Sequence, residues 1–158
     1  QPLHYIVVTE PDLCAKIFDC LKWAAYTAPK GTPAPGKTPT AYVVMAYDKE
    51  LAVEAMVKYD VGAAVQTMLL VGMEEGVGSC WLKSVNYAKV KEILGTPDEL
   101  ELDCVVALGY PDEAPALVNL EKDKTGLEVI KYWRDGENKQ FVPKRALENV
   151  LHWEKYQG

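Results

Sequence analysis

Nearly every residue from Val61 to Met73 is apolar or small, and this run constrains the fold more than any other feature of the sequence. Gln66 and Thr67 are the only polar side chains within it. A helix that is apolar on all sides is buried on all sides. The sequence therefore predicts a central helix that begins near Asp60 and is covered on every side, in part by a second subunit.

Short apolar runs elsewhere in the chain predict a β-sheet. Buried strands are expected at Leu3–Val8, Ala41–Tyr47 and Cys104–Leu108, with a further extended piece at Val77–Leu82. Near the end of the chain, Val129–Trp133 and Lys139–Val142 flank the turn-forming segment Arg134–Asn138. This last arrangement is typical of a β-hairpin.

Capping residues and helical spacing predict three further helices. Thr9 is expected to cap the first, which runs from Pro11 to about Tyr26. The second begins after Asn86 and stops at Gly95, a residue that suits the end of a helix. The third is expected over Ala146–Tyr156.

The length and charge of the chain exclude several classes of protein. With 158 residues it fits a single compact domain covering residues 1–158. Its net charge of −6 opposes general nucleic-acid binding, which needs a surplus of lysine and arginine. No apolar run approaches the roughly 20 residues that span a bilayer, so no membrane segment is predicted. Because a core strand starts at Leu3, we expect a further N-terminal portion before residue 1.

Cysteine and histidine usage predicts neither disulfides nor a metal site. The four cysteines form no Cys-x-x-Cys pair, and the two histidines are His4 and His152. Buried thiols of a cytoplasmic protein are the expected state. The sequence also lacks the Gly-x-Ser-x-Gly, His-Glu-x-x-His and Walker motifs, so no catalytic side chain is predicted.

Several segments that follow one another in fixed order carry a resemblance to a known family. They are Asp60–Leu70, Glu75–Leu82, Val90–Gly95 and Val105–Pro111, with weaker matches at Gln1–His4 and Val142–His152. The chain resembles the nitroreductase family of FMN-dependent enzymes, which take hydride from a reduced nicotinamide. The resemblance implies an α+β fold, with a central, mainly antiparallel sheet flanked by helices on both faces and an intertwined homodimer.

The resemblance also implies residues that hold the flavin ring. The amides of Lys83 and Ser84 would hydrogen-bond N5 and O4 of the ring and favour its reduction. Trp81 and Leu82 would form part of the wall under the ring, and the amide side chain of Gln1 would reach its edge. Without the family pattern, the same segment is an ordinary strand–helix turn.

For the FMN phosphate, the resemblance implies Lys144 and Arg145, because a dianion is held best by charge-assisted hydrogen bonds. Taken alone, such a pair before a helix is a solvated surface. The family normally carries an Arg-Arg-Ser-type segment near its N-terminus that supplies the main phosphate contacts, and no such segment stands before Gln1 in this sequence.

The implied reaction is ping-pong: NAD(P)H reduces FMN and leaves, and a small acceptor such as a nitroaromatic or a quinone enters the same site. The proline-rich segment Thr27–Thr40 is expected to be a surface loop at the substrate rim. Two alternatives stay open. One is a diverged family member that dehalogenates, oxidises a peptide-derived substrate or breaks down flavin, and the other is a flavin-binding protein without redox turnover.

Overall fold

The computed structural model describes residues 1–28, 30–121 and 124–156, and the chain divides into two compact units. The larger unit comprises Gln1–Trp23 and Thr32–Pro111, and the smaller unit comprises Ala24–Gly31 and Asp112–Gly158. That residues 1–158 form one domain stays a prediction.

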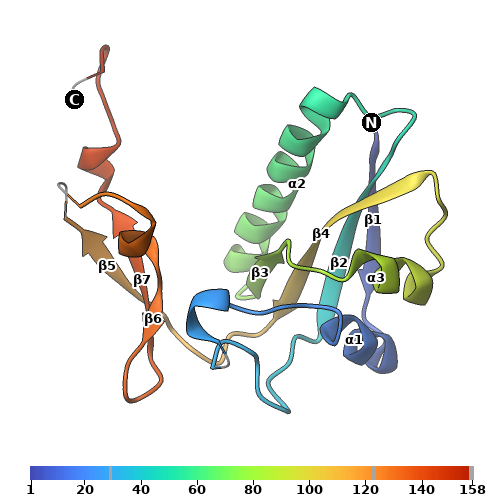
Figure 1. The fold of residues 1–158 in the computed structure, drawn as a ribbon, viewed down its shortest axis with the longest axis horizontal. Coiled ribbons are helices and arrows are strands. Elements are labelled where there is room, and N and C mark those ends of the chain that lie inside the picture. Colours follow the sequence, from blue (N-terminus) through green and yellow to red (C-terminus); the bar gives the residue numbers. More distant parts are fainter. Residues whose placement is uncertain (29, 122–123, 157–158) are drawn as a thin grey trace. The chain divides into compact units, whose positions relative to one another are not determined.

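A four-stranded antiparallel sheet forms the centre of the larger unit (Figure 1). Its strands are β1 (Leu3–Val8), β2 (Ala41–Asp48), β3 (Gly78–Leu82) and β4 (Leu100–Gly109). They lie side by side in the order β1-β2-β4-β3, so β1 and β3 are the edge strands. All four predicted extended segments are therefore confirmed, and β4 is longer than predicted.

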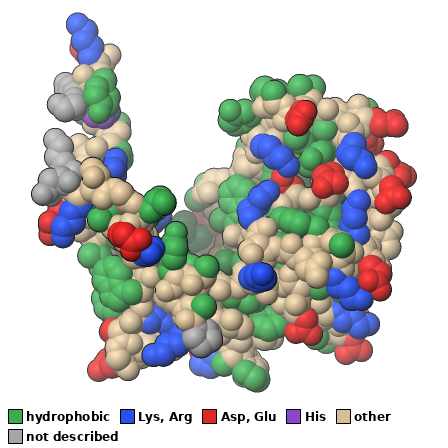
Figure 2. All heavy atoms as spheres, viewed as in Figure 1, with side chains coloured by type: hydrophobic (Ala, Val, Ile, Leu, Met, Phe, Trp, Pro, Cys, Tyr) green, Lys and Arg blue, Asp and Glu red, His purple; other side chains and the backbone are tan. Residues whose placement is uncertain are grey.

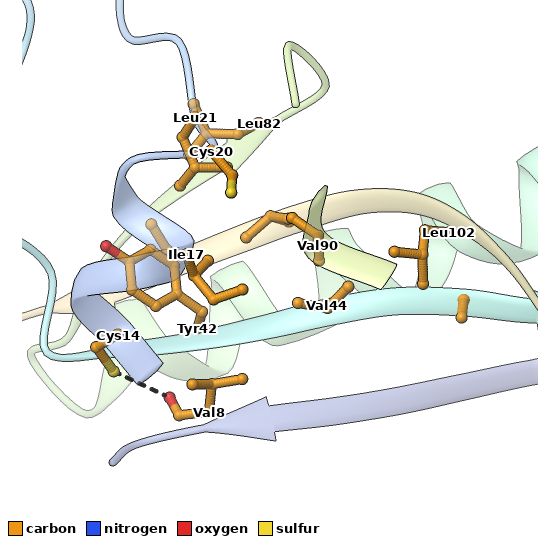
Figure 3. Close-up of a cluster of buried hydrophobic side chains, with 13 residues drawn as sticks. Val8, Cys14, Ile17, Cys20, Leu21, Tyr42, Val44, Leu82, Val90 and Leu102 are labelled. Carbon is orange, nitrogen blue, oxygen red and sulfur yellow. Dashed lines mark hydrogen bonds between the residues drawn. The ribbon is translucent and has the colours of Figure 1, made fainter. Parts of the chain in front are cut away.

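Helices cover both faces of this sheet, as predicted. On one face lie α1 (Pro11–Phe18) and α3 (Tyr87–Leu94), which bury Ile17 and Val90 in one cluster with Tyr42 and Val44 of β2 (Figure 3). On the other face lies α2 (Glu54–Glu74), which buries Val61 against β4. Because side chains alternate along each strand, the strands contribute residues to a core on each face of the sheet. The α+β fold class is confirmed.

The long helix α2 differs from its prediction in extent and in burial. It begins at Glu54 rather than near Asp60, because most of the residues in between (Glu54, Ala55, Met56 and Lys58) are good helix formers. Within the chain it buries Val57, Val61 and Val65, since a sheet covers only one side of a helix. The prediction of burial on every side is therefore wrong for the single chain. No helix in the described residues is long and apolar enough to cross a membrane.

The first helix, α1, is shorter than predicted and begins differently. Glu10, not Thr9, caps it, with carboxylate oxygens 3.1 Å and 2.8 Å from the backbone nitrogens of Asp12 and Leu13. The helix ends at Phe18 rather than near Tyr26. Past that point the chain pairs with the segment after β3, where Lys22 N donates to the carbonyl of Ser84 at 2.9 Å. This pairing replaces the last two predicted helical turns.

A β-bulge interrupts the pairing of β2 with β4. Met45 lies opposite Cys104, whereas the next residue, Ala46, lies opposite Leu102. Asp103 is therefore an extra residue on β4, without a partner on β2. Bulges redirect side chains and are frequent beside functional sites.

The smaller unit contains a three-stranded sheet. Its strands are β5 (Ala116–Leu120), β6 (Trp133–Arg134) and β7 (Gln140–Arg145), and they lie in the order β5-β7-β6. Two 3₁₀ turns, η1 (Ala25–Thr27) and η2 (Leu127–Ile130), also belong to this unit. The predicted hairpin is confirmed as β6 and β7, although its first strand is shorter than expected. The parallel strand β5 was not predicted.

The predicted last helix, Ala146–Tyr156, is wrong. A single 3₁₀ turn, η3 (Leu147–Asn149), stands in its place. The apolar side chains that suggested the helix, among them Leu147 and Trp153, are exposed. Because a helix in a protein draws most of its stability from packing its apolar face, this periodic stretch does not form one within the chain.

Candidate functional site

The predicted ring-binding segment lies at the end of β3, an edge strand of the larger unit. Successive residues of a strand point to opposite faces. Trp81 faces α2 and keeps 41% of its surface exposed, whereas Leu82 is buried in the core under α1 and α3. Trp81 is thus the side chain of this strand that can meet a planar ligand.

The turn at Lys83 and Ser84 follows directly, and its carbonyl groups are bound within the fold. The hydroxyl of Tyr87 lies 3.0 Å from the carbonyl oxygen of Lys83. The carbonyl of Ser84 accepts from Lys22 N at 2.9 Å. Both carbonyl groups of the turn are therefore occupied within the fold, and the role of the Lys83 and Ser84 amides stays a prediction.

The bulge residue Asp103 gathers two cations beside this turn. Its side chain is 2% exposed, and its two carboxylate oxygens lie 2.5 Å from Nζ of Lys58 and 2.7 Å from Nζ of Lys83. Nζ of Lys83 also donates to the backbone carbonyl of Asp103 at 3.0 Å, and the Tyr87 hydroxyl lies 2.5 Å from that carbonyl. We call Asp103, Lys58, Lys83 and Tyr87 the Asp103 cluster.

The electrostatics of the Asp103 cluster favour its charged form. Burial alone would raise the pKa of Asp103, but the hydrogen bonds from Lys58 and Lys83 outweigh it and hold this pKa below its ordinary value. Burial opposes the charge of Lys58, and its bond to Asp103 still leaves its pKa raised. Two ammonium groups and one carboxylate leave a net charge of +1 in the cluster.

Trp81 and the Asp103 cluster lie next to each other along α2. Lys58 and Gly62 are one helical turn apart on the same side of this helix. A Cβ atom on Gly62 would stand 3.9 Å from Cη2 of Trp81, and Nζ of Lys58 lies 4.8 Å from the ring centroid of Tyr47. An exposed aromatic ring therefore stands beside a pair of half-exposed cations.

The other predicted residues belong to other parts of the described chain. Gln1 is exposed at the start of the chain, next to Pro2, whose carbonyl accepts from Asp48 N at 2.8 Å. Lys144 and Arg145 are exposed at the end of β7, in the smaller unit, rather than ahead of a helix. As successive residues of a strand they point to opposite faces, so they do not form one clamp on the same face.

The sequence prediction missed Asp103, Lys58 and Tyr87. One signal for Asp103 was available, because it is the only charged residue between Leu102 and Leu108, in an otherwise apolar strand. Buried carboxylates of this kind are normally paired. No sequence signal identified Lys58 as its partner, because that pairing depends on how α2 crosses the sheet.

Comparison with known proteins gives the family of the chain. The model of the "Nitroreductase family" matches residues 24–110. A provisionally named NADH dehydrogenase/NAD(P)H nitroreductase of Archaeoglobus fulgidus is 29% identical over 119 aligned positions, and the match covers 72% of this chain and 63% of that protein. The chain thus spans less than two thirds of the length of this curated relative.

Solved structures share the fold at low sequence identity. The NADPH:FMN oxidoreductase of Vibrio harveyi, solved with NAD⁺, matches with a TM-score of 0.59 and 18% identity, over 100% of this chain and 61% of its own. An FMN-dependent nitroreductase of Clostridium difficile matches with a TM-score of 0.55 and 21% identity, over 72% of this chain and 65% of its own. These likenesses agree with the sheet and helices described above. The chain belongs to the nitroreductase family.

Proposed function

We propose that this protein is an FMN-dependent oxidoreductase that passes hydride or electrons from NAD(P)H to a small acceptor such as a nitroaromatic or a quinone. One observation carries the proposal: the exposed ring of Trp81 and the amide side of the Lys83–Ser84 turn lie together beside the Asp103 cluster. Family membership supports the same conclusion. The proteins of V. harveyi and C. difficile named above are described as FMN enzymes.

The residues at this place fit the ring end of FMN. An isoalloxazine needs a flat apolar contact, which Trp81 offers, and donors along its polar edge, which the Lys83 and Ser84 amides offer. Reduction makes the ring more electron-rich, and the positive cluster next to the turn stabilises that state. For the phosphate end, Lys144 and Arg145 remain our proposed cations, and because they point to opposite faces of β7, one of the two would meet a given phosphate.

When bound, FMN supplies the hydride and electron chemistry, so the chain itself needs no catalytic acid or base. The Lys83 and Ser84 amides orient the ring and draw electron density from it. Trp81 shields one part of the ring from water, and Leu82 holds the strand in place through its burial in the core. Gln1 is proposed to contact the ring edge through its amide side chain.

We further propose that two chains associate through α2. Met56, Tyr59, Ala63, Leu70 and Met73 follow one another at spacings of three, four, seven and three residues and are exposed. Together they form an apolar stripe on the side of α2 opposite Val57, Val61 and Val65. A second copy of the chain would cover this stripe, as the family resemblance implies. We place the activity in the cytoplasm, where NAD(P)H is available.

The test is a cofactor titration of the purified protein. Adding FMN should give a bound-flavin visible spectrum, and NADH or NADPH should bleach it in the absence of oxygen. A nitroaromatic or a quinone should then restore the oxidised spectrum. A protein that gains no flavin absorption contradicts the proposal.

Three comparisons sharpen this titration. Riboflavin, which lacks the phosphate, should bind more weakly than FMN, and one of the two variants Lys144→Met and Arg145→Met should lose that preference. A flavin that binds but is not bleached by either nicotinamide indicates a binding protein without turnover. A flavin that is bleached but not reoxidised by nitroaromatics or quinones indicates a diverged family member with another acceptor.

A further inference from the structure

We infer that Asp103 is a positioning residue of the proposed flavin site. It holds the Lys83–Ser84 turn in place because both its carboxylate and its backbone carbonyl accept hydrogen bonds from the Lys83 side chain. This inference rests on the proposed function for its cofactor. The Asp103 side chain faces Lys58, Lys83 and Tyr87, and none of these residues carries the chemistry itself.

The bulge on β4 makes the backbone carbonyl and the carboxylate of Asp103 available to bind Lys83. In a regular ladder, the carbonyl of a residue at this position would pair with the neighbouring strand. As the extra residue, Asp103 lies opposite no residue of β2, and its carbonyl accepts from Nζ of Lys83 at 3.0 Å. Its carboxylate takes the same ammonium group at 2.7 Å. One side chain is thus bound by both the backbone and the carboxylate of one residue.

The burial of Asp103 makes these bonds hard to release. A carboxylate that is 2% exposed pays a large desolvation cost unless it stays paired. Losing Lys83 would leave it with Lys58 as its remaining salt bridge. The Lys83 ammonium is therefore confined, although 57% of the Lys83 side chain is open to solvent.

The backbone of the turn is held at the same time. The Tyr87 hydroxyl lies within hydrogen-bonding distance of both the Lys83 and the Asp103 carbonyls, at 3.0 Å and 2.5 Å, and its single proton is shared between them. On the far side of the turn, Asn86 N donates to the carbonyl of Cys20 at 2.8 Å. The amides of Lys83 and Ser84 are consequently fixed before any ligand arrives. Donors that need no rearrangement are the ones that stabilise charge best.

Hydrogen exchange of the flavin-free, full-length chain tests the positioning directly. Asp103→Asn and Lys83→Met should speed amide exchange in residues 82–86 by about tenfold, the effect of losing one charged hydrogen bond. Lys83→Arg should restore slow exchange, because it keeps the cation. Lys89→Met is the matched control, since Lys89 pairs with Glu92 on the exposed side of α3 and should leave the turn unchanged.

Two results of this experiment would overturn the inference. One is unchanged exchange in residues 82–86 of both variants. The other is a matching rise in residues 82–86 of Ile17→Ala, a variant that destabilises the core of the unit elsewhere, which would mean that the turn follows global stability rather than Asp103.

FMN titration of the same variants then links the turn to the cofactor. Asp103→Asn and Lys83→Met should each weaken FMN binding by about tenfold, and the double variant should be no weaker than either single one, because the two residues act through one bond. Wild-type affinity in a variant whose turn exchanges faster would overturn the positioning role. If the wild-type chain binds no FMN, the proposed function fails, whereas the exchange result still decides whether Asp103 holds the turn.

Discussion

Gly62 of α2 and Trp81 of β3 face each other so closely that a Cβ atom on Gly62 would stand 3.9 Å from Cη2 of the tryptophan. That distance is ordinary van der Waals contact, so alanine fits at this position. Glycine within a helix costs about 0.5–1 kcal/mol relative to alanine. We therefore expect Gly62→Ala to stabilise the protein by that amount in urea unfolding. Gly62→Leu, in contrast, should displace the Trp81 ring and weaken FMN binding; a destabilising Gly62→Ala would contradict the packing described.

The lowered pKa of Asp103 gives stability a defined pH dependence. The group stabilises the fold fully above its unfolded-state pKa of about 3.9, and this stability is lost as pH falls through the lower folded-state value. Asp103→Asn should therefore be less stable than wild type by about 1.5–3 kcal/mol at neutral pH. The difference in melting temperature should stay constant from about pH 7 to 5 and shrink below about pH 4. A difference that grows on acidification would contradict this assignment.

Substitutions of Ile17 test how much the packing of α1 contributes to the stability of the larger unit. Its side chain is fully buried against the sheet. Ile17→Ala should cost about 2–5 kcal/mol, because it leaves a cavity, whereas Ile17→Val should cost about 0.5–1.5 kcal/mol. Urea unfolding measures both. Equal effects of the two variants would show that the site collapses around the smaller side chains.

The four cysteines should differ sharply in reactivity. Cys80 is exposed, whereas Cys14, Cys20 and Cys104 are buried. Burial raises the pKa of the Cys104 thiol to about 11, so it stays protonated at neutral pH. A thiol reagent should label one cysteine quickly in the native protein and all four in denaturant. Cys80→Ser should remove the fast phase, and a fast phase that survives would contradict the exposures described.

The apolar stripe on α2 should govern the oligomeric state. Leu70→Lys places a charge within the stripe, and we expect it to convert a dimer into a monomer in light scattering. Asp60→Asn makes the same change in net charge about a quarter of a turn around the helix, so it is the matched control and should remain dimeric. A wild-type chain that is monomeric at all concentrations would contradict the proposed association.

Sequence patterns predicted the helices that are determined by residues close to one another in the chain. The apolar run at Val61, the Asn86 cap and the Gly95 stop each describe a neighbourhood of a few residues, and each is confirmed. The resemblance carried by Asp60–Pro111 gave the α+β class, which no single element defines. The turn at Lys83 and Ser84 was likewise located from the sequence.

Features that depend on distant partners were not predictable in the same way. The first helix ends early because Lys22 pairs with Ser84, more than sixty residues away. The expected last helix fails because its apolar face, including Trp153, is exposed and packs against no core among the described residues. The Asp103 cluster joins residues from α2, β4 and the start of α3, so periodicity within any one of them does not indicate it.

Positive and negative side chains are mixed over the surface of the larger unit rather than gathered in separate patches. Figure 2 shows acidic and basic side chains interspersed over its visible face. With a net charge of −6 over the chain, this distribution favours small ligands that are gripped locally over extended polyanions. The Asp103 cluster is one such local concentration of positive charge.

Because Asp103 is the extra residue of the bulge, the packing of β4 in the two cores does not depend on it, whereas the proposed site depends on its carboxylate. Leu100 and Leu102 face the core under α1 and α3, as do Val105 and Ala107, while Cys104 and Val106 face α2. Without Asp103, these residues would alternate perfectly between the two faces. Deleting its codon should leave both cores intact while removing the carboxylate that holds Lys83. Selection could therefore gain or lose the charged cluster in one genetic step, with little risk to the scaffold that carries it.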